Sequence, residues 1–504
     1  MAMDISRPGL GWDGTGPERT ARWTSEPTIA SIAAVARRHL GIPASAPDSA
    51  CTVSFHAAGA FSRLYVVDSP SEGGQFIMRV SLPVDPARKT RGEVATLQLV
   101  RRRTDLPVPG VVAFDDTSGT EIGFEWVLME LMPGRNAYYR WRRMDMAQKE
   151  TLVVRVADLQ AQLYRCGSPA DGGFFRGIGT LGTATAEEED DDEKNFRGKG
   201  GRGVVSMLGE QQQQPGQIVS SVFFEGPHYH YAVPRGPFRC SHDWLRAHLL
   251  IIIKEHTTSL AGSRDSDHEK EQDSPDREYA EGVLRVARKL LRLLPKIFPS
   301  IVHLDERTVL WHDQLSLMNM LVDDNGRLTA IIDWECIATV PRWVASQMPE
   351  FLRGAVREEK PDRSRYTDVV STDSSSDETG TEDDDSSVAG GGGGRDGLLD
   401  DSLDNEGKTE LYWIHLMEYE QTQLRKVYSA RMRLLRPGWD ADLEEAALKV
   451  DFLDAVLRCN AGFYLKRLEQ WVDAVERREY VRLAEVLRIG IRKERAAKGK
   501  SSTR

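Results

Sequence analysis

The chain has 504 residues, enough for roughly two to four domains by length alone, and 28% of them are charged. Its net charge of −11 and pI of about 5.6 argue against a protein that binds nucleic acid through bulk positive charge. The apolar runs are too short to span a bilayer and the polar N-terminus shows no signal peptide. The five cysteines are scattered without a Cys-x-x-Cys pair, which is typical of a reducing compartment, so we expect a cytoplasmic protein. From the charge and the short apolar runs we expect no nucleic-acid or membrane partner.

The first 27 residues are polar and rich in Gly and Pro, and we expect them to be flexible. Residues 28–133 combine short strands with two helices. The predicted helices are Thr28–Leu40, which Gly41 ends, and Thr90–Arg103, which carries an apolar stripe. The predicted strands are Thr52–Phe55, Ser62–Val67, Phe76–Val80, Val111–Phe114 and Phe124–Leu131. This order indicates a small antiparallel sheet with one packed helix, which would form an N-lobe.

The rest of the chain is mostly helical and would form a C-lobe from residues 134–356 and 409–490. Three low-complexity stretches interrupt it, at about 183–214, about 257–276 and 357–408. They are acidic or rich in Ser, and cannot bury enough apolar surface to offset the entropy of ordering, so we expect disordered insertions. Their charges are expected to be solvated, with phosphorylated regulatory tails as the alternative. The basic residues 491–504 are expected to form a frayed tail.

The most informative motif is a loop that has the layout of a kinase catalytic loop. It reads Trp311-His312-Asp313-Gln314-Leu315-Ser316-Leu317-Met318-Asn319. The protein-kinase pattern is His-Arg-Asp-Leu-x-x-x-Asn, so Gln314 stands where the pattern has its catalytic Asp. A glutamine can orient a hydroxyl group by hydrogen bonding but cannot accept its proton. Asp313 would need a local rearrangement to substitute, and His312 is expected to bind the loop backbone.

An apolar hairpin follows this loop and is expected to return a carboxylate to it. Strands Met320–Val322 and Leu328–Ile332 flank an Asn-Gly turn, a strong hairpin signal. The hairpin would place Asp333 beside Asn319, whose amide oxygen, like a carboxylate, is a hard ligand suited to Mg²⁺. Glu335 could assist the metal site. The alternative is an ordinary acidic hairpin in which Asp333 caps a turn.

Three features of the predicted N-lobe suit a nucleotide triphosphate. The small-residue loop around Gly59 would let backbone N–H groups approach phosphates, although a plain hairpin has the same signature. Arg79 occupies the place of a phosphate-pairing lysine, with Glu93 on the next helix as its partner; a surface Arg–Glu pair is the alternative. The segment Val127–Gly134, which includes Glu130 and Met132, would be the hinge, whose backbone can read an adenine edge; it also has the pattern of a buried strand that ends in a turn.

Taken together, these blocks resemble the aminoglycoside phosphotransferase family, with its choline-kinase-like relatives, and in particular its fungal-type branch. Further resembling blocks are Thr90–Thr96, Leu106–Pro109, Leu128–Gly134, Gly236–Phe238 and Asp243–Leu245. The resemblance implies an α+β, two-lobed, protein-kinase-like fold with a small antiparallel-sheet N-lobe and a mostly helical C-lobe. It also implies ATP and Mg²⁺ in the cleft, with Asn319 and Asp333 as metal ligands and Arg79 at the triphosphate.

The expected function is therefore ATP- and Mg²⁺-dependent phosphoryl transfer to a hydroxyl of an unknown small-molecule or protein acceptor. Gln314 leaves a second interpretation open, a catalytically weak or inactive pseudokinase-like protein that binds nucleotide or acts as a scaffold. An unrelated helical interaction protein would leave the hairpin between Asn319 and Asp333 unexplained. The expected site residues are His312, Asp313 and Gln314 for catalysis, Gly59, Arg79, Glu93, Glu130 and Met132 for the nucleotide, and Asn319 and Asp333 for the metal.

Overall fold

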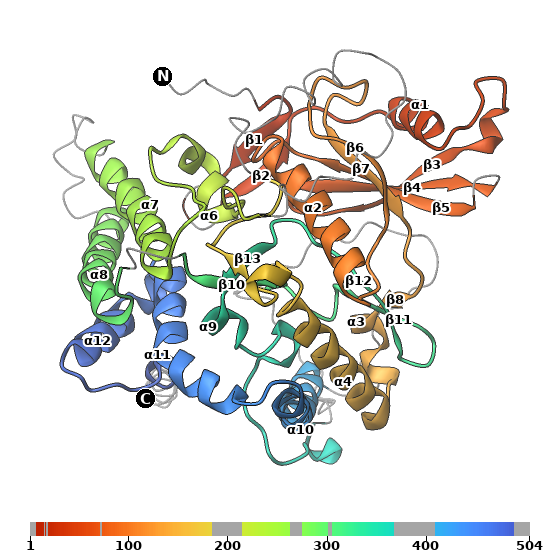
Figure 1. Ribbon diagram of the computed structural model, residues 1–504. Helices are drawn as coiled ribbons and strands as arrows, with labels where there is room; N and C mark the ends of the chain where they lie inside the picture. Colours follow the sequence, from red (N-terminus) through yellow and green to blue (C-terminus); the bar gives the residue numbers. More distant parts are fainter. Residues whose placement is uncertain are drawn as a thin grey trace, which may run out of the picture.

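The computed structural model consists of two lobes, and the chain passes from one to the other at residues 130–134 (Figure 1). It describes residues 7–14, 16, 19–70, 73–183, 214–262, 275–300, 305–366 and 409–487. The strands of the N-lobe lie on one side of the molecule and a group of long helices on the other. This arrangement confirms the two-lobed α+β fold expected from the sequence.

The N-lobe is built on a five-stranded antiparallel sheet with strand order β3-β4-β5-β7-β6. Its strands are β3 (Thr52–Ala58), β4 (Ser62–Ser69), β5 (Gly74–Ser81), β6 (Val111–Asp115) and β7 (Glu125–Glu130). Helix α1 (Ile29–His39) and helix α2 (Arg88–Arg103) cover opposite faces. Because side chains alternate along a strand, Met78 packs with α1 whereas Ile77 packs with α2. Arg79 therefore lies on the same face as α2.

The first residues of the N-lobe correct the expectation of a flexible N-terminus. Strands β1 (Leu10–Asp13) and β2 (Thr20–Trp23) pair as an antiparallel hairpin. Trp12 and Trp23 pack against the core of the N-lobe, and the ring of Trp23 lies 4.8 Å from that of Phe124. Burial of these aromatic side chains offsets the entropy that a polar segment would lose on ordering.

Among its described residues, the C-lobe has two small three-stranded sheets and helices that pack into two hydrophobic cores. Its helices are α3 (Ala137–Arg140), α4 (Met146–Leu163), α6 (Ser221–Phe224), α7 (Ser241–Gly262), α8 (Pro275–Ile297), α9 (Arg342–Ala345), α10 (Glu410–Leu435), α11 (Trp439–Arg458) and α12 (Leu465–Glu476). Its strands are β8 (Arg135–Asn136), β9 (Phe175–Arg176), β10 (Arg307–Trp311), β11 (Met320–Val322), β12 (Leu328–Ile331) and β13 (Ala338–Pro341).

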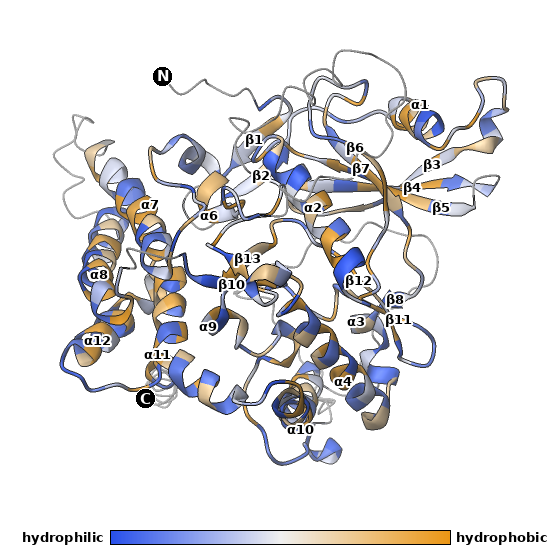
Figure 2. Ribbon diagram, viewed as in Figure 1, coloured by the Kyte–Doolittle hydropathy of each residue, from blue (hydrophilic) through white to orange (hydrophobic). Residues whose placement is uncertain are grey.

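One core lies among α7, α8, α11 and α12. The other lies between α4, α10 and the loop after β10, and it also includes Ala95, Leu97, Leu99 and Val100 of the N-lobe helix α2. Hydrophobic and hydrophilic residues alternate along these helices, as amphipathic packing requires (Figure 2). None of the helices in the described ranges is long and apolar enough to cross a membrane.

A second connection between the lobes runs through α6. Phe223 belongs to the core around α7 and α8, whereas its neighbour Phe224 belongs to the core of the N-lobe. The ring of Phe224 contacts that of Phe61, which lies in the β3–β4 turn, at 5.2 Å. The Arg235 guanidinium donates to the backbone oxygen of Phe223 at 2.8 Å and so holds α6 in place. The two adjacent phenylalanines thus tie both lobes to one short helix.

The low-complexity stretches fall mainly outside the described residues. This applies to residues 184–213, 263–274 and 367–408, and also to the basic tail. Helix α7 continues to Gly262 and α8 begins at Pro275, so both ends of the expected insertion at 257–276 are helical. The first ten residues of the expected linker, 357–366, also belong to the described structure.

Candidate functional site

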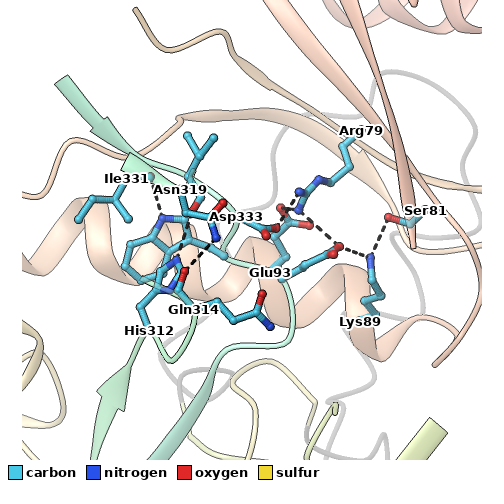
Figure 3. A network of polar contacts seen from close by, with 12 residues as sticks. Arg79, Ser81, Lys89, Glu93, His312, Gln314, Asn319, Ile331 and Asp333 are labelled. Carbon is cyan, nitrogen blue, oxygen red and sulfur yellow. Dashed lines mark hydrogen bonds and ion pairs between the residues drawn. The ribbon is translucent and has the colours of Figure 1, made fainter. Parts of the chain in front are cut away.

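Arg79 is the centre of a polar network between the lobes (Figure 3). Its Nη1 lies 2.7 Å from Glu93 Oε1 on α2, and its Nη2 lies 3.0 Å from Asp333 Oδ1, which follows β12. Its Nη1 also lies 3.5 Å from Glu335 Oε2. Arg79 and Glu93 are 8% and 3% exposed, so their pair is buried and not a surface pair.

The surroundings of Arg79 favour its charged form. Burial alone would lower the pKa of Arg79, but the carboxylates of Glu93, Glu335 and Asp333 raise it well above its usual value. A guanidinium held in this way is a fixed positive charge between the lobes. Its shape also suits the oxygens of a carboxylate or a phosphate.

Sequence reasoning missed a second buried cation, Lys89. It lies on α2, one turn before Glu93, and is 1% exposed. Its Nζ lies 2.6 Å from Glu335 Oε2 and donates to Ser81 Oγ at 3.3 Å. The signal in the sequence was its spacing, because residues four apart on a helix share one face. Glu335, which could assist the predicted metal site, pairs with this lysine.

The hairpin of β11 and β12 brings the two predicted metal ligands together. Met320 pairs with Ile331, and the backbone N–H of Ile332 donates to the carbonyl oxygen of Asn319 at 3.0 Å. Asn319 Nδ2 donates to the backbone oxygen of Gln314 at 2.9 Å. This bond turns the amide so that its oxygen stays available. Asp333 has a φ of 66°, a left-handed conformation that is uncommon for residues other than Gly.

The catalytic-loop residues differ in their environments. His312 is buried, its Nε2 lies 3.1 Å from the backbone oxygen of Ile332, and its ring contacts Trp334 at 4.9 Å, so it joins the loop to the hairpin. Gln314 is exposed. Asp313 also has exposed surface, but dense surrounding protein desolvates its carboxylate and raises its pKa, while His312 and Arg353 lower it.

The remaining predicted nucleotide residues take no part in the ion pairs of Arg79 and lie in the β3–β4 turn and at or just after the end of β7. The backbone N–H of Gly59 donates to the oxygen of Ser62 at 2.8 Å and closes the β3–β4 turn. The Glu130 carboxylate accepts hydrogen bonds from Arg101 at 2.8 Å and from the backbone N–H of Gly110 at 3.0 Å, so its side chain bonds to other residues of the N-lobe. Met132 is half-buried in the hinge.

Comparison with known sequences identifies the family. The sequence model of the phosphotransferase enzyme family APH matches residues 52–344, which is more than half of the chain. The matched region includes Arg79, Glu93, the catalytic loop and Asp333. The chain therefore belongs to the APH phosphotransferase family, and the resemblance stated from the sequence is confirmed.

Individual relatives are distant. Subtelomeric hrmA-associated cluster proteins of two Aspergillus fumigatus strains are each 24% identical over 324 residues, which cover 58% of this chain and 59% of the relative. The chain thus spans about three fifths of the length of these curated relatives.

Among solved structures, a choline kinase from Cryptosporidium parvum has 11% identity and a TM-score of 0.41, with 94% of this chain and 97% of that chain covered. An aminoglycoside phosphotransferase from Alicyclobacillus acidocaldarius has 12% identity and a TM-score of 0.25, with 86% and 99% covered. Because these TM-scores lie below 0.5, the family assignment rests on the match of the family's sequence model.

Proposed function

We propose that this chain transfers a phosphoryl group from ATP, with Mg²⁺, to a hydroxyl of an acceptor. The observation that carries the proposal is the contact of Arg79 with both Glu93 and Asp333. It joins a strand and a helix of the N-lobe to the carboxylate of the C-lobe hairpin. Phosphoryl transfer depends mainly on such positioning of charges around the triphosphate.

The metal ligands proposed are Asn319 and Asp333. Within the described residues, no three His, Cys, Asp or Glu side chains form a cluster that could hold a metal by themselves. That composition still fits Mg²⁺, which commonly binds one or two protein oxygens and takes its other ligands from water and phosphates. The amide of Asn319, oriented by its bond to Gln314, and the carboxylate of Asp333 supply these oxygens. When bound, Mg²⁺ would neutralise charge on the phosphates.

The chain's own residues would perform the other tasks. Arg79, freed in part from Asp333, would bind phosphate oxygens, and the hinge backbone at residues 130–132 would contact the base. The acceptor oxygen would form a bond to the γ-phosphorus while the bond from that phosphorus to the ADP oxygen breaks. Gln314 would orient the acceptor hydroxyl, whose proton passes to a phosphate oxygen or to water because no carboxylate stands at this position.

The second candidate is a nucleotide-binding protein with little or no turnover. The observation that favours it is Gln314, because general-base catalysis typically contributes a rate factor of about 10² to 10⁴. Both candidates share the nucleotide cleft and differ in chemistry. Binding must therefore be measured before turnover.

The decisive experiment is the melting temperature of the protein with Mg-ATP, with ATP and chelator, and without ligand. We expect Mg-ATP to stabilise the wild type, by about 2.7 kcal/mol at a hundredfold excess over Kd. Asp333→Ala should abolish the metal-dependent part of this shift. Asp324→Ala is a matched control, because this carboxylate lies on the same hairpin but its side chain is 93% exposed. No shift in the wild type at millimolar ATP would contradict the proposal.

A further inference from the structure

Lys89 lies in an unusual place for a lysine. It is buried on α2, and its ammonium group points toward Ser81 and a carboxylate of the network (Figure 3). Its partner Glu335, at 2.6 Å, follows Asp333 by two residues. The pair therefore joins the N-lobe helix directly to the C-lobe segment of the proposed metal site.

The carboxylates around the Lys89–Glu335 pair explain why the network contains two cations, Arg79 and Lys89. Three carboxylates, those of Glu93, Asp333 and Glu335, lie close to Arg79. With Lys89 present, Glu335 has its own partner at 2.6 Å, and Arg79 can contact Glu93 and Asp333 at 2.7 and 3.0 Å. Without Lys89, Glu335, already 3.5 Å from Arg79, would compete with Asp333 for the guanidinium.

The backbone between Asp333 and Cys336 also needs to be held in place. Asp333 and Cys336 have φ values of 66° and 59°, a region that non-glycine residues adopt at a cost and keep only when their surroundings enforce it. Before this segment, the backbone N–H groups of Ile331 and Ile332 donate to Pro107 and Asn319 at 2.9 and 3.0 Å. Glu335 lies between these two strained residues, and its ion pair with Lys89 holds this part of the backbone in place.

We propose that Lys89 is a positioning residue that, through Glu335, fixes the backbone and carboxylate of Asp333 for the metal and couples the position of α2 to it. This inference rests on the proposed function, because it assigns the metal role to Asp333. Lys89 itself contacts neither the nucleotide nor the metal in this scheme.

Stability alone is a weak explanation for this pair. Replacing both members of a buried ion pair with neutral side chains of similar size is often neutral or even stabilising, because two charges no longer have to be desolvated. A pair kept only for stability should therefore be replaceable without consequence for Asp333. Replacing a pair that positions Asp333 should instead disturb Asp333.

The test compares two double variants that remove one positive and one negative charge each. Lys89→Met/Glu335→Gln removes the proposed pair. Lys149→Met/Glu420→Gln removes a buried pair of similar length, 2.7 Å, between α4 and α10 in the C-lobe, where neither residue belongs to the site. Lys89→Arg retains the charge and tests for rescue.

Two readouts are measured for each variant. The first is amide hydrogen exchange of residues 331–337 without ligand, and the second is the Mg²⁺ concentration that gives half of the ATP-dependent rise in melting temperature. For Lys89→Met/Glu335→Gln we expect exchange to accelerate about tenfold. We expect the half-saturating Mg²⁺ concentration to rise about 10- to 100-fold, the usual effect of losing a partner that orients a metal ligand. The Lys149/Glu420 variant should change neither readout by more than about twofold, and Lys89→Arg should lie near the wild type.

The exchange readout separates failure of this inference from failure of the proposed function. Unchanged exchange at residues 331–337, or an equal effect in the Lys149/Glu420 variant, overturns the positioning role. If exchange is faster in the Lys89→Met/Glu335→Gln variant but the wild type does not bind Mg-ATP, the proposed role of Lys89 in positioning a metal ligand is overturned. If the first double variant does not accumulate as folded protein, Glu335→Gln alone is measured with the same readouts and judged by the same outcomes.

Discussion

Gln314 is the residue on which the chemistry of this protein depends. It lies on the loop whose other landmarks, His312 and Asn319, are connected to the hairpin through Ile332. Its backbone oxygen orients the Asn319 amide, so the loop geometry needs no carboxylate at this position. What the loop lacks at position 314 is a carboxylate that could accept the proton of the attacking hydroxyl.

We therefore predict that Gln314→Asp increases turnover of ATP by about 10²-fold or more, because it supplies this base to an otherwise assembled site. The measurement is ATP consumption with a panel of hydroxyl-bearing acceptors, together with Mg-ATP affinity, which should stay within about twofold of the wild type. Gln314→Asn is the matched control and should gain nothing. Equal turnover in the aspartate and asparagine variants would indicate that the loop has diverged beyond the loss of one residue.

Residue-level prediction from sequence succeeded where a motif fixed the spacing. The expected contact of Arg79 with Glu93 is present, and so is the approach of Asp333 to Asn319 through the hairpin. Lys89 was missed because its spacing from Glu93 on α2 does not by itself distinguish a buried lysine from a solvated one. Its burial follows from the packing of α2 on the sheet and from the place of Glu335 in the other lobe.

At the scale of elements, the packing of α6 on α7 buries a histidine. His248 of α7 is 4% exposed, and its ring contacts those of Phe223 and Trp244 at 5.2 and 5.3 Å. Its Nε2 has no hydrogen-bond partner among the described residues. Burial lowers the pKa of His248 from 6.5 to about 4, so the native state holds this ring neutral.

This burial predicts acid sensitivity. Between pH 6.5 and about 4 the unfolded chain binds a proton at His248 that the native state does not, so stability is complete above pH 6.5 and is lost as the pH falls toward 4. The loss attributable to this residue is about 3 kcal/mol. Urea unfolding across this pH range should show that His248→Leu is less acid-sensitive than the wild type. His56→Gln, at an exposed histidine, should keep the wild-type profile; an unchanged profile for His248→Leu would contradict the prediction.

At the scale of the whole molecule, the low-complexity stretches leave and return to the body at neighbouring points. The N–H of Thr409 donates to the oxygen of Tyr366 at 3.2 Å across residues 367–408, and the N–H of Gly216 donates to the oxygen of Thr180 at 2.9 Å across residues 184–213. Residues 367–408 contain 13 acidic and two basic residues, an excess equal to the net charge of the chain. The remainder is therefore electrically balanced.

We predict that residues 367–408 can be replaced with a Gly-Ser-Gly-Ser linker without loss of the fold. Shortening a closed loop of this length lowers the entropic cost of closure by about 2 kcal/mol, so the melting temperature should rise by a few degrees. The pI should rise from about 5.6 toward neutrality. Calorimetry and isoelectric focusing check these outcomes. A lower melting temperature would mean that the acidic segment contributes contacts to the folded state.

The amino-acid sequence by itself determined the local elements and the family. The alternating strands, the stripe on α2 and the hairpin around the Asn-Gly turn are set by residues close in sequence, whose periodicity and turn chemistry can be read directly. The order of these elements and the catalytic-loop motif then indicated the two-lobed fold.

Only the tertiary structure decided which charged side chains pair with one another and which contacts hold the two lobes together. Three features depend on side chains that are far apart in the chain. They are the pairing of Lys89 with Glu335, the packing of Phe223 and Phe224 into two different cores, and the ordering of the β1–β2 hairpin. The burial that makes such contacts strong arises only when the lobes pack together, because desolvation is a property of the assembled fold and not of a local sequence.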